Sequence, residues 1–214
     1  MKSVVICFVF TLNSLNFFAS DATGFHLIYK IHPLAAINPL RPTAQGSLEA
    51  QFGRRWGVAF TYGYQYIYRM KFDTLVVTDP KGQTIKVDFK YYIGNPVSNY
   101  HNGKFALQYL GIGLWYVEES GNELFRYSGT HAGVHVKNRI IAINYGFVVD
   151  HKRYTLECIL NAGVRFKERT MDWLDNRQPV YDNKNGGWGF SHTYNFKGIA
   201  PHVGMGVRIG YRLF

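Results

Sequence analysis

Large apolar residues alternate with small or polar residues along most of the chain. In the segment 154–167, Tyr154 and Leu156 begin the apolar series, whereas Thr155 and Glu157 begin the other. A period of two residues is typical of β-strands whose two faces meet different surroundings. The sequence therefore predicts eight strands, at 25–37, 44–52, 58–71, 85–93, 105–116, 140–149, 154–167 and 202–214.

Two of these segments depart from strict alternation. Residues 105–108 fit the register of the rest of their strand poorly, which is consistent with a β-bulge. In the last strand, Phe214 falls on the face opposite Val203 and Leu213. A local bulge or a frayed last residue would bring Phe214 onto the apolar face, and otherwise the mismatch would affect the efficiency of assembly.

The links between the predicted strands differ in length at the two ends. Links 53–57, 94–104 and 150–153 follow the even-numbered strands. Links 38–42, 72–84, 118–137 and 168–198 follow the odd-numbered strands, and the last two are much longer than the others. In an up-and-down antiparallel sheet, one end would carry short turns and the other end long loops.

The volume of the side chains indicates which face points inward. Eight strands close a barrel whose interior is just wide enough for side chains to fill. A lipocalin-like barrel would put the apolar set inside, but Tyr62, Tyr64, Tyr66 and Tyr68 on one strand would overfill it. The other set is rich in Gly, Ala, Ser and Thr, and it carries charges of both signs that can pair in a polar interior. The expected interior charges are Lys30, Glu49, Arg69, Lys86, Asp88, Lys90, Glu157, Arg165, Arg208 and Arg212.

An apolar outer face on a closed barrel belongs in lipid. Strands of about ten alternating residues, with short turns at one end and long loops at the other, are typical of outer-membrane barrels. The fold class predicted here is all-β: an eight-stranded antiparallel, up-and-down transmembrane β-barrel with short periplasmic turns and longer extracellular loops. Such a protein would lie in the outer membrane of a Gram-negative bacterium, among its lipid and lipopolysaccharide.

The N-terminal segment has the features of a secretory signal. Lys2 precedes an apolar run too short to span a bilayer, and small residues follow near Ala22. We expect residues 1–22 to be the signal peptide and 23–214 to form the barrel. After cleavage only Cys158 would remain, which excludes an intramolecular disulfide in that part of the chain.

The net charge of +10 is divided between the expected interior and the loops. The basic residues form no continuous patch for nucleic acid, so no nucleic-acid partner is expected. The loop charges suit the phosphates of lipopolysaccharide and anionic glycans better.

Four stretches carry a resemblance to known families. YKIHPLAAINPLRP, FGRRWGVAFTYGYQYIY, NYGF and GVRIGYR resemble a family of Bacteroidota outer-membrane barrels of unknown function, often encoded near fimbrial subunits. At a broader level, the chain after residue 22 looks like the small barrels related to the membrane domain of outer membrane protein A. The last strand also resembles the signal read by the outer-membrane insertion machinery. The resemblance implies fold, location and surface or fimbrial partners, but no enzymatic activity.

Candidate chemical residues give weaker indications. Ser191 and His192 are candidates for the Ser–His–acid arrangement that an outer-membrane lipid A deacylase uses. Adjacent residues on an extended chain point to opposite faces, and the His-x-Ser order of that family would need a serine at Tyr194. We therefore predict no catalytic residues.

Histidines and glycines do not change this picture. His131 and His135 would suit a metal only on a helix, but THAGVHVKN reads as extended, so no metal site or cofactor is expected. His26, His32 and His202 fall on the inward face, where they can bridge charged neighbours. The GIG and GMG motifs have no helix after them and make room in a narrow interior.

The long segment 168–198 is rich in aromatic residues. Its candidates for surface contacts are Trp173, Tyr181, Trp188, Phe190 and Tyr194. They can anchor a partner, or they can pack over the mouth of the barrel. The function expected from the sequence is a non-enzymatic outer-membrane barrel with a structural or surface-interaction role, accessory to fimbrial or surface assembly. A lipid A-modifying enzyme and a small-solute pore are the alternatives.

Overall fold

A computed structural model describes most of the predicted strand regions of the chain. It covers residues 25–37, 42–52, 55–65, 69–71, 75–93, 105–125, 130–151, 153–173 and 196–213. The expected signal peptide, 1–22, and the terminal Phe214 lie outside the described residues.

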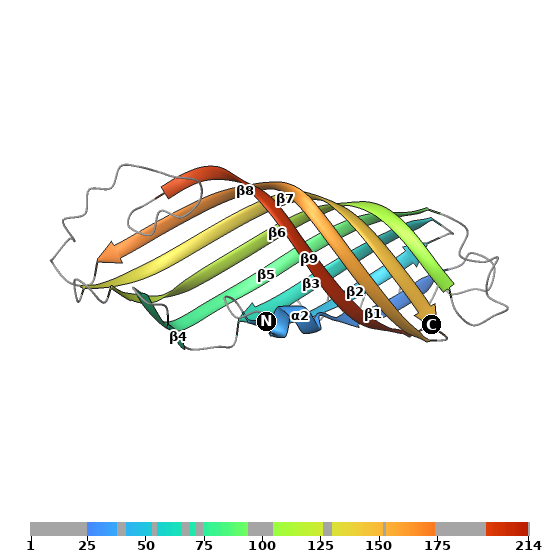
Figure 1. The fold of residues 1–214 in the computed structure, drawn as a ribbon, viewed down its shortest axis with the longest axis horizontal. Coiled ribbons are helices and arrows are strands. Elements are labelled where there is room, and N and C mark those ends of the chain that lie inside the picture. Colours follow the sequence, from blue (N-terminus) through green and yellow to red (C-terminus); the bar gives the residue numbers. More distant parts are fainter. Residues whose placement is uncertain are drawn as a thin grey trace, which may run out of the picture.

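The described residues form one continuous antiparallel sheet (Figure 1). Its elements are β1 (His26–Ile31), α2 (Pro33–Ala36), β2 (Thr43–Phe52), β3 (Trp56–Gln65), β4 (Arg69–Lys71), β5 (Leu75–Ile93), β6 (Phe105–Phe125), β7 (Thr130–His151), β8 (Tyr154–Trp173) and β9 (Phe196–Arg212). β3 pairs with β5, and β1 pairs with β9, so eight strands of the described chain form a ring. The eight antiparallel strands predicted from the sequence are confirmed. The short β4 adds only to the edge of β5.

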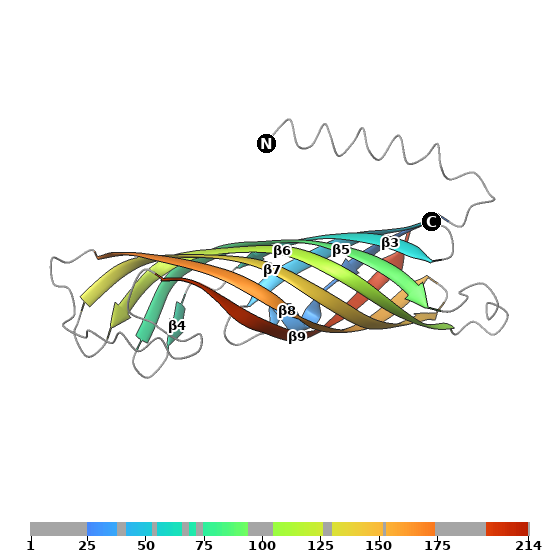
Figure 2. The ribbon, with the colours of Figure 1, turned by 90° about the horizontal axis from the view of Figure 1, so that it is seen from above.

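Strands β6, β7 and β8 are longer than the alternation predicted. They contain 21, 22 and 20 residues and extend past β1–β3 at one end of the sheet (Figures 1 and 2). The prediction of a loop over 118–137 is therefore wrong, because β6 continues to Phe125 and β7 begins at Thr130. Polar residues occupy the outer face of this extension, and the apolar residues lie on its inner face, where Val134, Val136 and Met171 are buried.

The first strand is shorter than predicted. β1 ends at Ile31, and Pro33–Ala36 form the helical turn α2. Proline has no N–H for a sheet hydrogen bond but is well tolerated in the first turn of a helix. The expectation that the strand runs to 37 is wrong for this reason, and α2 lies against β2 and β9.

The seam that closes the ring is short. β1 pairs with β9 over four residue pairs, from Ile28 with Arg212 to Ile31 with Ile209. Among the described residues, the part of β9 before Ile209 has no strand on that side. Leu213 N–H bonds to Leu27 O, which shows that odd-numbered residues of this segment direct their N–H groups toward β1. Pro201 shares this parity, so it removes a donor from the open edge, a position that suits proline.

The expected bulge at 105–108 is absent from the ladder. β6 pairs with β7 in continuous register from Phe105 to Phe125. The pattern blurs because Leu107 is buried inside the ring. The register shift lies instead in β5, between Thr78 and Lys81, where Pro80 cannot donate a ladder hydrogen bond.

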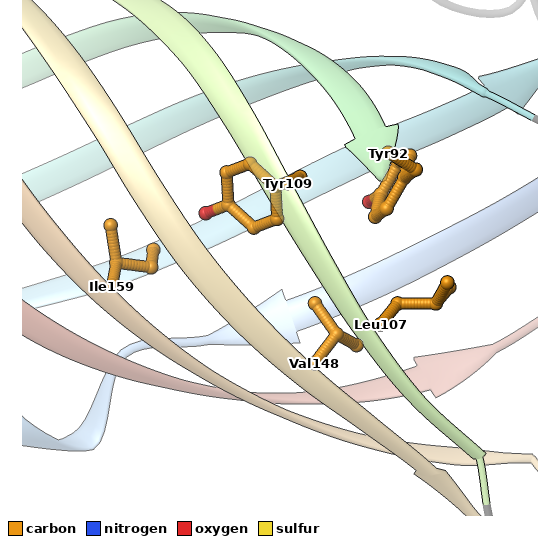
Figure 3. Packing of buried hydrophobic residues seen from close by; sticks show 5 residues of the cluster. All are labelled: Tyr92, Leu107, Tyr109, Val148 and Ile159. Atoms are coloured by element: carbon orange, nitrogen blue, oxygen red, sulfur yellow. The ribbon is translucent and has the colours of Figure 1, made fainter. Parts of the chain in front are cut away.

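Near the short-turn end, the interior holds a small apolar cluster with two tyrosines (Figure 3). Its members are Tyr92, Leu107, Tyr109, Val148 and Ile159. Glycines make room for the rings: a Cβ at Gly146 would overlap the Tyr109 ring, and one at Gly57 would lie 3.2 Å from Tyr92.

Gly146→Ala should destabilise the protein by about 1–3 kcal/mol, because the new methyl group overlaps a fully buried ring. Gly206→Ala is the matched control, since nothing lies within 4 Å of its Cβ position. The free energy of unfolding by urea in lipid vesicles measures both. Equal costs would show that Tyr109 does not fill the space at Gly146.

Candidate functional site

The candidate site is a group of six charged side chains inside the ring. We call it the charge cluster, and it consists of Lys30, Glu49, Asp88, Lys90, Glu157 and Arg208. They come from β1, β2, β5, β8 and β9. Each is no more than 4% exposed.

Two lysines and two glutamates form the centre of the charge cluster. Lys30 Nζ lies 2.8 Å from Glu49 and 2.6 Å from Glu157. Lys90 Nζ lies 2.5 Å from Glu49 and 2.7 Å from Glu157. Each ammonium group therefore bridges both carboxylates, and each carboxylate meets both ammonium groups.

Arg208 and Asp88 extend the charge cluster toward the long-strand end. Arg208 Nη2 lies 2.8 Å from Asp88, and its Nη1 lies 3.7 Å from Glu157. The indole N–H of Trp115 and the side-chain amide of Asn144 also donate to Asp88, at 2.9 and 3.0 Å. This carboxylate is thus held by donors from β6, β7 and β9.

Two phenols also donate hydrogen bonds to the glutamates. Tyr92 donates its hydroxyl to Glu49, and Tyr109 donates to Glu157 at 2.5 Å. Lys90 Nζ also lies 4.6 Å from the centre of the Tyr109 ring. Sequence reasoning placed Tyr92 on the inward face but missed both tyrosines as partners. Gly57 and Gly146, which lie next to these rings, were the sequence feature that could have indicated the two tyrosines. A buried ring needs a neighbour without a side chain.

The charge cluster is electrically balanced. Three cations meet three carboxylates, and all of them are buried. Buried charges that lose a partner each carry a desolvation penalty of several kcal/mol, whereas paired and hydrogen-bonded charges recover much of it. The arrangement fills the interior with fixed dipoles and charges at this level of the ring.

Other residues expected to face inward lie elsewhere in the interior. Arg212 bonds to Asp150 at 2.8 Å, near the short-turn end. Asp150 is not among the interior charges expected from the sequence, because residues 150–153 are predicted to form a turn. Lys86 donates to Gln45 at 3.2 Å and lies 4.8 Å from the centre of the Trp115 ring. Arg165 is half-buried on β8.

Arg69 begins β4, but its side chain is not among those described. The side chains of the aromatic candidates in segment 168–198 are not among those described either. Trp173 ends β8, and its side chain is not described. Tyr181, Trp188, Phe190 and Tyr194 lie outside the described residues, as do Ser191 and His192.

The histidines do not form a metal site in the part of the chain that is described. His32 shares a 3.1 Å hydrogen bond with Ser47, and His202 packs edge-on against Trp115. His135 lies on the outer face, 3.0 Å from Glu118. The described residues contain no group of three or more His, Cys, Asp or Glu that could hold a metal ion. Cys158 is a free thiol on the outer face.

The outer face carries apolar residues over the ring and charged residues beyond them. We call the latter the charged belt, a row of Glu118, Lys137, Glu168 and Lys197 that are cross-strand neighbours on β6 to β9. Lys197 lies 2.8 Å from Glu168. This contact lowers the pKa of Glu168, and a hydrogen bond from Gln83 lowers the pKa of Glu118.

At the short-turn end, aromatic residues of the outer face meet in pairs. Trp56 packs on Tyr91 with ring centres 4.9 Å apart, and Tyr154 packs on Tyr211 at 5.5 Å. Arg55 donates to the Tyr91 hydroxyl and Arg153 to the Tyr211 hydroxyl. The apolar zone thus lies between an aromatic rim and the charged belt.

Comparison with known proteins gave no match to a family model, a curated protein or a solved structure. The resemblance to Bacteroidota barrels and to outer membrane protein A therefore remains a prediction. None of the described helices is long and apolar enough to cross a membrane.

Glu157→Ala should destabilise the protein by about 3–5 kcal/mol, because it leaves Lys30, Lys90 and Arg208 with one carboxylate fewer in a buried site. Glu168→Ala is the control. It removes an ion pair whose lysine side chain is 79% exposed, and it should cost less than about 1 kcal/mol. Urea titration of folded protein in vesicles compares the two, and a cost for Glu157→Ala as small as the control's would contradict the pairing.

Proposed function

We propose that the chain is an eight-stranded transmembrane β-barrel of the Gram-negative outer membrane, without enzymatic activity. Its role would be structural or in surface interaction, through the long-strand end. An accessory part in fimbrial or surface assembly is supported only by the sequence resemblance. The same proposal includes secretion through an N-terminal signal and delivery to the outer-membrane insertion machinery.

The observation that carries the proposal is the inverted distribution of polarity. Charged side chains are fully buried inside the ring, whereas large apolar side chains cover its outside: Ile143 is 67% exposed, Met205 78% and Val203 82%. A continuous apolar outer surface of this kind is unfavourable in water and marks a lipid or protein contact. The paired strands of the ring also satisfy their backbone hydrogen bonds internally, as the bilayer requires, except along the edge of β9 before Ile209.

The height of the apolar zone supports the same conclusion. On β7 five outward apolar residues lie between Ile141 and Val149, a segment of nine residues. A tilted transmembrane strand needs about 9–11 residues. The zone ends at Arg139 on one side, and the aromatic pairs lie at the other side, where the interface of a membrane would be.

A charged residue in the middle of the apolar zone tests this proposal. Ile143→Arg should cost about 2–4 kcal/mol in a bilayer, because its guanidinium would meet lipid. Thr170→Arg on the outer face of β8 lies beyond the zone, beside His135, and should cost close to nothing. Folding titrations in phosphatidylcholine vesicles measure both costs. Equal costs, or clean extraction of the native protein from membranes at alkaline pH, would refute the membrane placement.

The filled interior argues against the alternative that the protein is a small-solute pore. The charge cluster crosses the ring with contacts of 2.5–2.8 Å between its lysines and glutamates, and the Tyr92 and Tyr109 rings lie beside it. We expect no steady ionic current from wild-type protein in planar bilayers. We expect Glu157→Ala to give fluctuating conductance, because loss of the carboxylate leaves its cationic partners in the charge cluster without that ion pair. A steady ohmic wild-type current that Glu157→Ala leaves unchanged would favour the pore.

A further inference from the structure

The wall of the ring is interrupted beside α2. β1 leaves the ladder after Ile31, whose partners are Gly46 on β2 and Ile209 on β9. One further bond follows, from His32 N–H to Gln45 O at 3.1 Å. Among the described residues, no strand lies between β2 and β9 beyond this point. α2 lies against both strands, so a helical turn stands where a strand would otherwise continue.

A groove of about 700 Å³ opens on the outer face beside this interruption. Its lining comes from α2 and from β1, β2 and β3. The large side chains of the lining are Tyr29, Ile31, Phe60 and Tyr62, each 45–49% exposed, so they belong to the outer surface and not to the interior. The volume is in the range of sites that hold a small ligand.

Small residues keep the groove open between these side chains. Ala36, Ala44 and Gly46 belong to its lining. A Cβ at Gly46 would lie 3.1 Å from the Tyr29 hydroxyl, which shows that the tyrosine side chain lies close over this glycine. Larger side chains at these positions would occupy the groove themselves.

The buried polar side chains of the lining already have partners. His32 Nε2 lies 3.1 Å from Ser47 Oγ, and both residues are buried. Gln45 donates to Thr43 at 2.6 Å and accepts a hydrogen bond from Lys86 at 3.2 Å. A ligand would therefore meet a mainly apolar surface, which favours a hydrocarbon over a polar molecule.

The groove lies inside the apolar zone of the outer face. Gly46 lies six residues before Phe52, which ends β2 at the short-turn end, and Tyr62 lies six residues past Trp56 of the aromatic rim. On β7 the outward apolar segment extends nine residues from the same end. The groove is therefore part of the surface that the proposed function assigns to lipid.

We propose that this groove holds one acyl chain of a membrane lipid. An empty groove would forfeit the dispersion contacts of its walls, and a flexible hydrocarbon chain restores them. The chain would contact the tyrosine and phenylalanine rings on its sides, whereas chains elsewhere on the outer face contact the protein on one side only. This inference rests on the proposed membrane placement, and it adds one lipid held at a defined place beside α2.

The experiment uses the full chain purified in octyl glucoside, whose short alkyl chain competes weakly, and titrated with dipalmitoyl phosphatidylcholine. Native mass spectrometry counts the lipids bound to each protein molecule. We expect the first lipid to bind about tenfold more tightly than the next, because the groove surrounds its chain. Dihexanoyl phosphatidylcholine has the same headgroup and should show no such preference.

Two matched variants test the place of binding. Ala44→Trp puts an indole into the groove from an exposed position and should weaken the first lipid about tenfold. Ala162→Trp adds the same ring to the exposed outer face of β8, outside the lining of the groove, and should leave the affinity unchanged. The heat-dependent shift in gel mobility shows that each variant is folded before it is compared.

Equal affinities for the first and later lipids, or a first lipid that Ala44→Trp leaves in place, would overturn the proposal. A dimer that Ala44→Trp dissociates would overturn it too, since a second copy of the chain would then occupy the groove. An equal preference for the dihexanoyl lipid would show binding through the headgroup and contradict the proposal. None of these results would bear on the membrane placement, which the Ile143→Arg comparison tests separately.

Discussion

Each charge in the ring's interior would be strongly unfavourable without its partners, and those partners come from distant parts of the chain. Lys30 on β1 meets Glu157 on β8, and Arg208 on β9 meets Asp88 on β5. These pairs can form only when the ring is closed. The Lys30–Glu157 pair also crosses the seam between β1 and β9, where only four residue pairs hold the backbone together. The charge cluster and the closed sheet therefore stabilise each other.

Burial of polar groups inside the ring has consequences for both faces of the sheet. Interior space is limited, so Tyr109 is accommodated only because Gly146 leaves room for it. Large aliphatic and aromatic side chains are then directed outward, where they form a continuous apolar surface. In the proposed membrane placement, the bilayer would provide apolar surroundings for this surface. The charged belt and the aromatic pairs bound that surface in the positions expected of two membrane interfaces.

Alternation predicted most of the ring, because the period of two depends only on the contrast between the two faces. It failed where that contrast is reversed. Beyond Glu118 the outer faces of β6 and β7 are polar and the inner face is apolar, with Val134 and Val136 buried, so the prediction of a loop over this paired ladder is wrong. Pro33 ended β1 early for a reason visible in the sequence, namely its missing N–H. Within the site, the alternation of residues along each strand predicts that Glu49 and Glu157 both point inward. It does not predict which side chains they contact. Partners such as Tyr109 depend on the stagger between strands, which a single sequence does not specify.

The central claim is that the outer surface meets lipid while the interior excludes it. Nuclear Overhauser effects between lipid acyl protons and side-chain methyl groups, measured in nanodiscs, test this claim most directly. The account predicts contacts from acyl chains to Ile143, Val203 and Met205, and none to the buried Ile140, Val148 and Ile159. Acyl contacts to both groups, or water contacts along the outer methyl groups in place of lipid, would contradict it.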